Sequence, residues 1–344
     1  MKQIIFDIGS GSVGAAVTHL SRDGAPHLSY TTRVAIPFQR ELSGKRLLSA
    51  MCQALGEASE RVLREGGAHG EEIFVSLSAP WVSARTTTLT LRAARAVLIT
   101  RSLLASLREE GVAQMEGMVQ IEEKLFRTTI EGYETPSPFG KRARHAEFSL
   151  FQSFAPAGLP EQIEETISHH LPGRVFGFHA FSLLAFAFLR ELVPSARNFY
   201  FADVSGEQTE LGVVKNRELT EIKSIPFGRN SLLRALHSSG YSAGIGASML
   251  ALYREARGTG ARFEKVVKKL RESSAEWGRR LHSFLPSDVA SVTLFLFADE
   301  DARPALRGAL PEDLNVIEVD AAFAKHPDPF LAIPALVASQ LAVH

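Results

Sequence analysis

Apolar and polar positions follow one pattern twice along the chain. In each half, an apolar run enters a short polar turn that begins with an aspartate, Asp7 or Asp203, and a second apolar run follows the turn. Apolar runs on both sides of a short polar turn are typical of a β-hairpin. The strands predicted in this way lie at residues 4–6 and 15–17 in the first half and 199–202 and 211–214 in the second.

The correspondence continues beyond these hairpins. A further turn follows each of them, at 21–24 and 215–218, and a third strand then ends in the same tripeptide, Ile-Pro-Phe, at 36–38 and 225–227. An amphipathic helix is predicted next in both halves, because apolar residues recur every three or four positions. These residues are Leu47, Leu48, Met51, Leu55, Ala58 and Val62 in the first helix and Leu232, Leu233 and Leu236 in the second. Agreement in order and spacing favours a duplicated βββα unit over chance.

The segment between the two halves predicts a small α+β unit. Strands are expected at 72–78 and 81–92, helices at 101–110 and 117–124, strands at 126–130 and 147–154, and a turn at 132–141. Near the end of the chain, residues 329–338 predict an apolar helix that belongs to the core.

Length and composition describe a folded protein with two lobes. A single hydrophobic core stops growing at about 250–300 residues, and this chain has 344. The net charge is zero, which excludes a whole-molecule field toward nucleic acid. The single cysteine, Cys52, cannot form an internal disulfide, and the N-terminus lacks a signal-peptide pattern, so we expect a cytoplasmic protein. The most apolar stretch, 175–189, is shorter than a membrane span and predicts a buried strand and helix.

The two aspartate-led turns resemble the phosphate-binding loops of the actin/Hsp70/sugar-kinase superfamily. The resemblance implies an α/β fold of duplicated ribonuclease-H-like (actin-like ATPase) domains, with ATP and Mg²⁺ between the lobes. Glycines allow backbone N–H groups to approach phosphates, and hydroxyls can donate to them. It implies nucleotide binding by Asp7, Gly9, Ser10, Gly11, Ser12, Asp203, Ser205, Gly206, Gln208 and Thr209, with Mg²⁺ held through water by Asp7 and Asp203.

The inserted unit is similar to the small subdomain of the bacterial actin relatives FtsA and PilM. Its turn matches their Gly-Tyr-x-x-x-x-Pro-x-Gly pattern at 132–140. The resemblance divides the chain into a first actin-like domain, an inserted subdomain and a second actin-like domain that carries a reduced helical subdomain. The bounds expected are 1–70 and 156–195 for the first domain, 71–155 for the insertion, 196–344 for the second domain and about 229–285 for the helical subdomain.

Three departures from the superfamily pattern bear on nucleotide binding. Ser205 and Glu207 replace two glycines of the second loop, and an unpaired Glu207 would repel a phosphate by about 1–4 kcal/mol at about 4 Å. The strand at 291–297 leads into three acids at 299–301 instead of a glycine pair, and residues 178–184 offer no carboxylate to orient a water. ATP hydrolysis, nucleotide binding alone and a nucleotide-free protein are three open alternatives.

Other charged or polar segments have simpler interpretations. His169 and His170 are expected at a helix C-terminus, where histidine meets the helix dipole favourably. The lysine-rich run 264–271 predicts the solvated face of an amphipathic helix rather than a nucleic-acid or lipid patch. Residues 241–257 leave open an adenine-contacting helix or a shortened subdomain.

The resemblance implies a role in assembly. PilM-like proteins grip the short cytoplasmic tail of a membrane protein at the base of the type IV pilus machine, and FtsA-like proteins tether the division ring and form homo-oligomeric filaments. FtsA-like chains end in an amphipathic membrane helix, whereas residues 329–338 predict a core helix. We therefore expect a PilM-like cytoplasmic scaffold that a partner holds at the inner membrane and that is an ATPase at most. A division protein is the alternative, and a small-molecule kinase is a lesser one because no motif supplies its catalytic aspartate. No nucleic-acid partner is expected.

Overall fold

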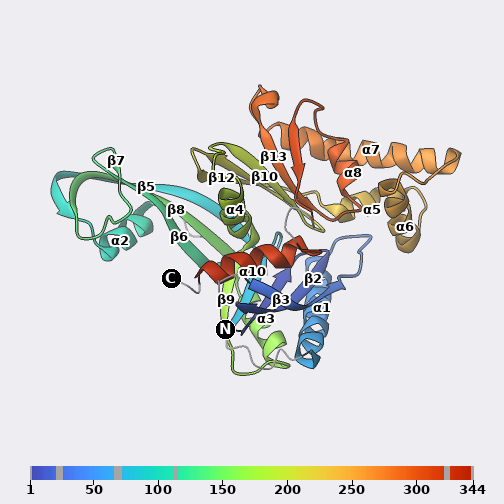
Figure 1. The fold of residues 1–344 in the computed structure, drawn as a ribbon, viewed down its shortest axis with the longest axis horizontal. Helices are drawn as coiled ribbons and strands as arrows, with labels where there is room; N and C mark the ends of the chain where they lie inside the picture. Colours follow the sequence, from blue (N-terminus) through green and yellow to red (C-terminus); the bar gives the residue numbers. More distant parts are fainter. Residues whose placement is uncertain (1, 21–25, 66–71, 112–114, 321–325, 342–344) are drawn as a thin grey trace.

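The computed structural model describes residues 2–20, 26–65, 72–111, 115–320 and 326–341. It contains two five-stranded sheets with the same strand order (Figure 1). The first has the order β3-β2-β1-β4-β9, with β1 (Lys2–Ile8), β2 (Ser12–Leu20), β3 (Pro26–Ala35), β4 (Glu72–Leu77) and β9 (Val175–Ala180). The second has the order β12-β11-β10-β13-β14, with β10 (Phe199–Val204), β11 (Thr209–Lys215), β12 (Glu218–Ile225), β13 (Thr293–Ala298) and β14 (Asn315–Glu318). The predicted duplication is confirmed.

The predicted turn between β11 and β12 has a tight geometry. Asn216 and Arg217 both have positive φ, 52° and 68°. Positive φ at two successive residues is the conformation of a type I′ turn, one of the two common two-residue hairpin turns. The corresponding turn of the first half, predicted at 21–24, lies outside the described residues.

Helices cover the sheets and also fill the space between them (Figure 1). The first sheet carries α1 (Gly44–Arg64) and α3 (Leu159–Ser168), and the second carries α5 (Arg229–Ser238), α6 (Ala243–Arg254), α7 (Ala261–His282) and α8 (Arg303–Arg307). Two helices pack against each other between the lobes. They are α4 (Phe181–Leu192), which contacts β10 and β11, and α10 (Pro329–Leu341), which contacts β1 to β4. The C-terminal segment thus returns to the first sheet.

Strand β10 shows how the alternation of side chains builds two cores. Phe199 and Phe201 point inward and join one cluster with the first sheet, α4 and α10. Ala202 and Val204 belong to a second cluster with α5 to α8. Successive side chains of a strand point to opposite faces, so a strand buried on both faces reads as a continuous apolar run.

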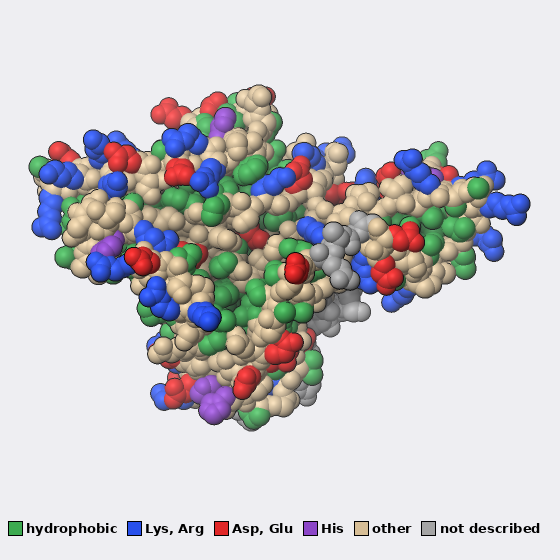
Figure 2. Space-filling model, turned by 180° about the vertical axis from the view of Figure 1, so that it is seen from behind, with side chains coloured by type: hydrophobic (Ala, Val, Ile, Leu, Met, Phe, Trp, Pro, Cys, Tyr) green, Lys and Arg blue, Asp and Glu red, His purple; other side chains and the backbone are tan. Residues whose placement is uncertain are grey.

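The inserted subdomain projects sideways from the two lobes (Figure 2). Its sheet has the order β5-β8-β6-β7, formed by β5 (Ser83–Leu98), β6 (Met118–Ile130), β7 (Tyr133–Glu134) and β8 (Arg142–Pro156), and α2 (Arg101–Gly111) packs on it. The prediction of a helix at 117–124 is wrong, because this segment is the first half of β6. Glu and Lys favour a helix locally, but antiparallel pairing with β8 along the whole of β6 outweighs that preference. No helix among the described residues is both long and apolar enough to cross a membrane.

Candidate functional site

The turns after β1 and β10 lie against each other at the centre of the molecule. They bring together eight of the ten predicted site residues, all except Gln208 and Thr209. Their closest approach joins two glycines. A Cβ added to Gly206 would lie 2.5 Å from the backbone nitrogen of Gly11 and 2.7 Å from its Cα. Real Cβ atoms essentially never come within 3.0 Å of such atoms. The two loops are therefore in direct backbone contact.

The serine hydroxyls predicted to bind phosphate hold the two loops together instead. The Oγ atoms of Ser10 and Ser205 are 3.0 Å apart, and Ser205 Oγ donates to the carbonyl of Ala79 at 2.7 Å. The Glu207 N–H donates to Ser10 Oγ at 2.8 Å. The Thr209 hydroxyl donates to Phe227 O, at 2.7 Å, within the second lobe. In this conformation these hydroxyls are occupied by protein groups.

Little space remains between the loops. The carboxylates of Asp7 and Asp203 line one common cavity, which has a volume of about 30 Å³. That volume suits a water molecule or two. Ligand pockets in proteins usually measure about 300–1,000 Å³. A polyphosphate could enter only if the loops separated.

A guanidinium lies beside the first predicted magnesium ligand. Arg33, on β3, donates from Nη2 to Asp7 Oδ2 at 2.9 Å and from Nε to Asp328 Oδ2 at 2.8 Å. Its Nη1 donates to Ser12 Oγ at 2.9 Å. Gly14 is opposite Arg33 in the hairpin, and a Cβ there would lie 2.7 Å from the guanidinium. The glycine thus leaves room for Arg33 to reach Asp7, and the arginine supplies the positive charge that Mg²⁺ would otherwise bring.

Burial dominates the electrostatics of both predicted magnesium ligands. Burial raises the pKa of Asp7 to about 7, although Arg33 opposes the shift. Burial first, and then the charge of Glu210, raise the pKa of Asp203 well above its usual value. Asp203 and Glu210 are paired across β10 and β11, and burial raises the pKa of Glu210 to about 7 as well.

Glu207, the bulky acid of the second loop, is paired. Its carboxylate forms an ion pair with Arg234 and accepts a hydrogen bond from Asn230 Nδ2 at 2.8 Å. Both partners belong to α5. The expectation of an unpaired, repelling carboxylate is therefore wrong, because a cation from the next helix neutralises it.

The N-terminus of α5 is occupied by the loop itself. The backbone N–H groups of Arg229 and Asn230 donate to the carbonyls of Ser205 and Gly206 at 3.0 and 2.8 Å. Free N–H groups at a helix N-terminus form a common phosphate site. Here the loop carbonyls use those donors.

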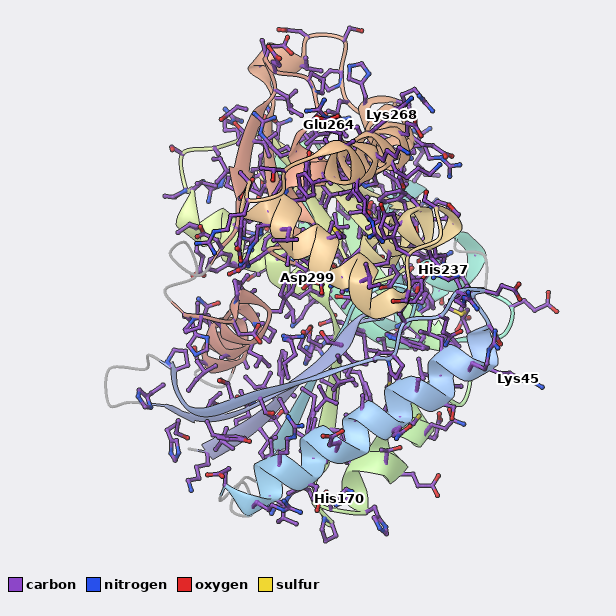
Figure 3. The ribbon with its side chains drawn as sticks, turned by 90° about the vertical axis from the view of Figure 1, so that its right-hand side faces the viewer. Lys45, His170, His237, Glu264, Lys268 and Asp299 are labelled. Atoms are coloured by element: carbon purple, nitrogen blue, oxygen red, sulfur yellow. The ribbon has the colours of Figure 1, made fainter. Side chains whose placement is uncertain are left out.

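Acids after β13 face the same region. Arg229 binds Asp301 through Nε and Nη2, at 2.8 and 2.5 Å, and lies 3.6 Å from Asp299. Burial raises the pKa of Asp299, which Figure 3 shows between the two lobes. Two of the three acids predicted in place of a glycine pair are thus held by Arg229, and the third, Glu300, pairs with Arg254.

The residues present do not fit Mg-ATP in this arrangement. The loops touch, the hydroxyls are used, and one candidate metal ligand is bound by arginine while the other is buried. Among the described residues, no group of three or more His, Cys, Asp or Glu side chains could hold a metal ion. We therefore derive no chemical step through a nucleotide or a metal.

A larger hollow of about 940 Å³ opens beside α5, in front of the segment between β3 and α1. Arg40 donates to Nε2 of His237, whose Nδ1 contacts the carbonyl of Tyr241 at 2.8 Å. Arg234 lies on the wall, and its Nε donates to Gln39 O at 3.2 Å. This hollow is open and lies outside the contact between the loops.

A separate groove runs between the subdomain and the lobes, where β6, α4 and α10 meet. It has a volume of about 330 Å³. Glu122 of β6 contacts Nδ1 of His179 at 2.8 Å and accepts a hydrogen bond from Ala180 N at 3.3 Å. The walls are mainly apolar, with two cations, and consist of Lys124, Leu125, Phe126, Leu183, Leu184, Phe186, Ala187, Arg190 and Val337.

Sequence reasoning missed the arginines of the central site. Arg33, Arg229 and Arg234 lie on elements predicted correctly, but the pattern does not reveal which acid each would meet. One usable signal existed, because Gly14 pairs with Asp7 on one side, in β1, and with Arg33 on the other side, in β3. The groove lined by Phe126 and Ala187 gave no signal, since the segment containing β6 was partly predicted as a helix.

The remaining sequence candidates lie far from the central site. His169 caps the C-terminal end of α3, as predicted. Figure 3 shows His170 at the base of the first lobe and Glu264 and Lys268 on the outer helix α7 of the second lobe. In the run 264–271, charged side chains lie on the exposed face of α7, as predicted, while Val266 and Leu270 are buried on its other face.

Comparison with known proteins identifies the fold. No protein-family model and no curated protein matches the sequence. The chain is similar to a solved structure titled "PilM-PilN type IV pilus biogenesis complex", with 13% identity, a TM-score of 0.65 and 98% of each chain covered. It is also similar to the ethanolamine utilization protein EutJ from Carboxydothermus hydrogenoformans, with 10% identity, a TM-score of 0.52, and coverage of 98% of this chain and 89% of that chain. These likenesses show the fold alone.

Proposed function

We propose that this chain, which has the predicted actin-like ATPase fold, is a PilM-like cytoplasmic scaffold that binds the tail of a membrane protein and works without bound nucleotide. The observation that carries the proposal is the groove between β6 and α4, which lies between two sheet edges. Support also comes from the PilM–PilN structure, whose title names a complex.

The two sheet edges that border the groove, β6 and β9, are joined by Glu122 but form no ladder with each other in the described part of the chain. Among the described residues, β6 pairs with β8 on one side, whereas on its other side β7 pairs only at Thr129 and Ile130. Strand β9 is the last strand of the first sheet. An open edge offers unpaired N–H and C=O groups to an extended peptide, which can add as a further strand.

The chemistry of the groove suits a short tail that mixes apolar and acidic residues. Phe126, Leu183 and Ala187 offer apolar contacts, while Lys124 and Arg190 provide positive charge at the rim. The acid of the groove, Glu122, is already bonded to His179 and Ala180. A volume of about 330 Å³ accommodates a few side chains, which agrees with a peptide rather than a folded domain.

Nucleotide-free operation is supported by the contact between the two loops. A conformational cycle driven by ATP would need space for phosphate between Gly11 and Gly206. The two glycines are so close that even a Cβ added to Gly206 would not fit. The same contact argues against a small-molecule kinase, which must hold a transferable phosphate there. A division protein of the FtsA kind remains the alternative scaffold, and electron microscopy for filaments distinguishes it.

The groove can be blocked by one substitution. Ala187 is half-buried on α4 and lines the groove, so Ala187→Arg fills it without removing a core side chain. Ala251→Arg, at a half-buried alanine of α6, is the matched control. Each variant and the wild type would be used as bait in membrane extracts, with mass spectrometry of the captured proteins.

The proposal predicts that the wild type and the control Ala251→Arg capture a membrane protein with a short cytoplasmic segment. Ala187→Arg should not capture that protein. A synthetic peptide of that segment should then bind the wild type and not Ala187→Arg. Equal capture by all three baits, or a peptide that binds Ala187→Arg as well as the wild type, would refute the groove as the docking site.

A further inference from the structure

The far end of the inserted subdomain concentrates positive charge. Two segments meet there, residues 92–101 and 139–145, and together they contain no Asp or Glu. Their six cations are Arg92, Arg95, Arg101, Lys141, Arg142 and Arg144, which we call the basic tip. Because the whole chain has zero net charge, this concentration is local.

Contacts in the structure hold the two segments side by side. The Ile99 N–H donates to Lys141 O at 2.8 Å, and the Gly140 N–H donates to Ile99 O at 2.9 Å. Leu98 is paired with Arg142 between β5 and β8, and the Arg101 guanidinium lies 5.6 Å from the ring centroid of Phe139. The six side chains therefore project from one end of one small unit.

The cations of the basic tip face solvent, although Lys141 Nζ also donates to the Thr135 hydroxyl at 2.6 Å. All six residues are exposed, and none forms an ion pair with an acid in the described part of the chain. Glu131, an acid close to the tip, accepts backbone hydrogen bonds from Arg144 N at 2.7 Å and His145 N at 3.2 Å. The backbone therefore holds its carboxylate, and the charge of Arg144 acts on it more weakly than these two hydrogen bonds do.

Large apolar side chains lie among these charges. Tyr133 is 80% exposed, Leu98 45% and Phe139 41%. Figure 2 shows Lys and Arg side chains, with apolar side chains between them, at the end of the molecule where the subdomain projects. The combination of exposed cations with exposed aromatic and aliphatic groups is typical of surfaces that contact the headgroup region of a bilayer.

We propose that the basic tip binds the surface of an anionic lipid bilayer directly. The tip is a projecting end, and a flat bilayer can meet a projecting end, whereas peptides and small ligands take concave sites. Cations would contact lipid phosphates, and Tyr133, Leu98 and Phe139 would reach the boundary between headgroups and acyl chains. Nucleic acid could bind the same cations, but an exposed leucine would have few groups to contact on it.

The proposal goes beyond tail binding in the groove, and its test requires no partner protein. The purified full chain would be sedimented with vesicles of phosphatidylcholine alone and with vesicles that contain one third phosphatidylglycerol. Arg95→Gln, Arg142→Gln and Arg144→Gln combined removes three charges from the basic tip. Lys265→Gln, Lys268→Gln and Arg271→Gln combined removes three exposed charges from α7 and is the matched control.

We expect the wild type to bind the anionic vesicles and not the neutral ones. Each cation near such a surface strengthens binding about 5-fold, so the tip variant should lose about 100-fold in partitioning, while the α7 variant changes only a few-fold. No binding of the wild type, or equal loss in both variants, would overturn the proposal. A DNA duplex that displaces the wild type from the vesicles and is bound through the same three arginines would also overturn it, in favour of a nucleic-acid surface.

Discussion

Gly206→Ala tests the contact between the two loops. The added Cβ would lie 2.5 Å from Gly11 N, whereas ordinary van der Waals contact begins at 3.4 Å. The loops must then separate by about 1 Å along this direction. The matched control is Gly9→Ala, whose Cβ would meet nothing closer than Ser12 O at 3.5 Å. Neither glycine has the positive φ that would strain an alanine.

The magnitude follows from what this separation breaks. The hydrogen bonds between Ser10 and Ser205, at 3.0 Å, and from Glu207 N to Ser10, at 2.8 Å, would stretch beyond hydrogen-bond distance. Each contributes about 0.5–1.5 kcal/mol. Replacing glycine by alanine also raises the free energy of unfolding by about 0.4–1 kcal/mol, because alanine reduces the conformational entropy of the unfolded chain. Gly206→Ala should therefore lower the free energy of unfolding by about 1–2 kcal/mol, and Gly9→Ala should leave it unchanged or raise it slightly.

Urea denaturation followed by tryptophan fluorescence suits this measurement. The chain has two tryptophans, and each is bonded to one loop region. Trp81 Nε1 donates to Gly9 O at 2.9 Å, and Trp277 Nε1 donates to Thr209 Oγ1 at 3.1 Å. Equal unfolding midpoints for Gly206→Ala and Gly9→Ala would refute direct contact between the loops.

Two further predictions concern the buried acids. Burial raises the folded-state pKa of Glu210 from 4.5 to about 7, so the folded state binds more protons and the free energy of unfolding falls as the pH rises between these values. Glu210→Gln should remove this fall, which amounts to up to about 3 kcal/mol between pH 5 and 8. An unchanged pH profile would contradict the prediction. Arg234→Met should cost about 3 kcal/mol because it leaves Glu207 buried without its cation. Adding Glu207→Gln should recover most of that loss in the same urea titration, and no recovery would refute the pairing.

The parts of the fold that local pattern determines were predictable from the sequence. The duplicated hairpins around Asp7 and Asp203 appear as repeated apolar runs and turns, and the sheets built on them have the same strand order. Segment 117–124 was not predictable in this way, because its strand conformation depends on pairing with β8. Partners across the fold decide the central site too. Whether Glu207 repels a phosphate depends on Arg234, which lies on α5. No sequence rule relates the positions of these two residues.

Titration of Mg-ATP into the wild-type chain in a calorimeter tests the central claim most directly. With the loops in contact around a cavity of about 30 Å³, we predict no saturable heat with Mg-ATP in the millimolar range. Saturable one-to-one binding with a micromolar dissociation constant would contradict the account, because it would show that the two loops open to admit a polyphosphate.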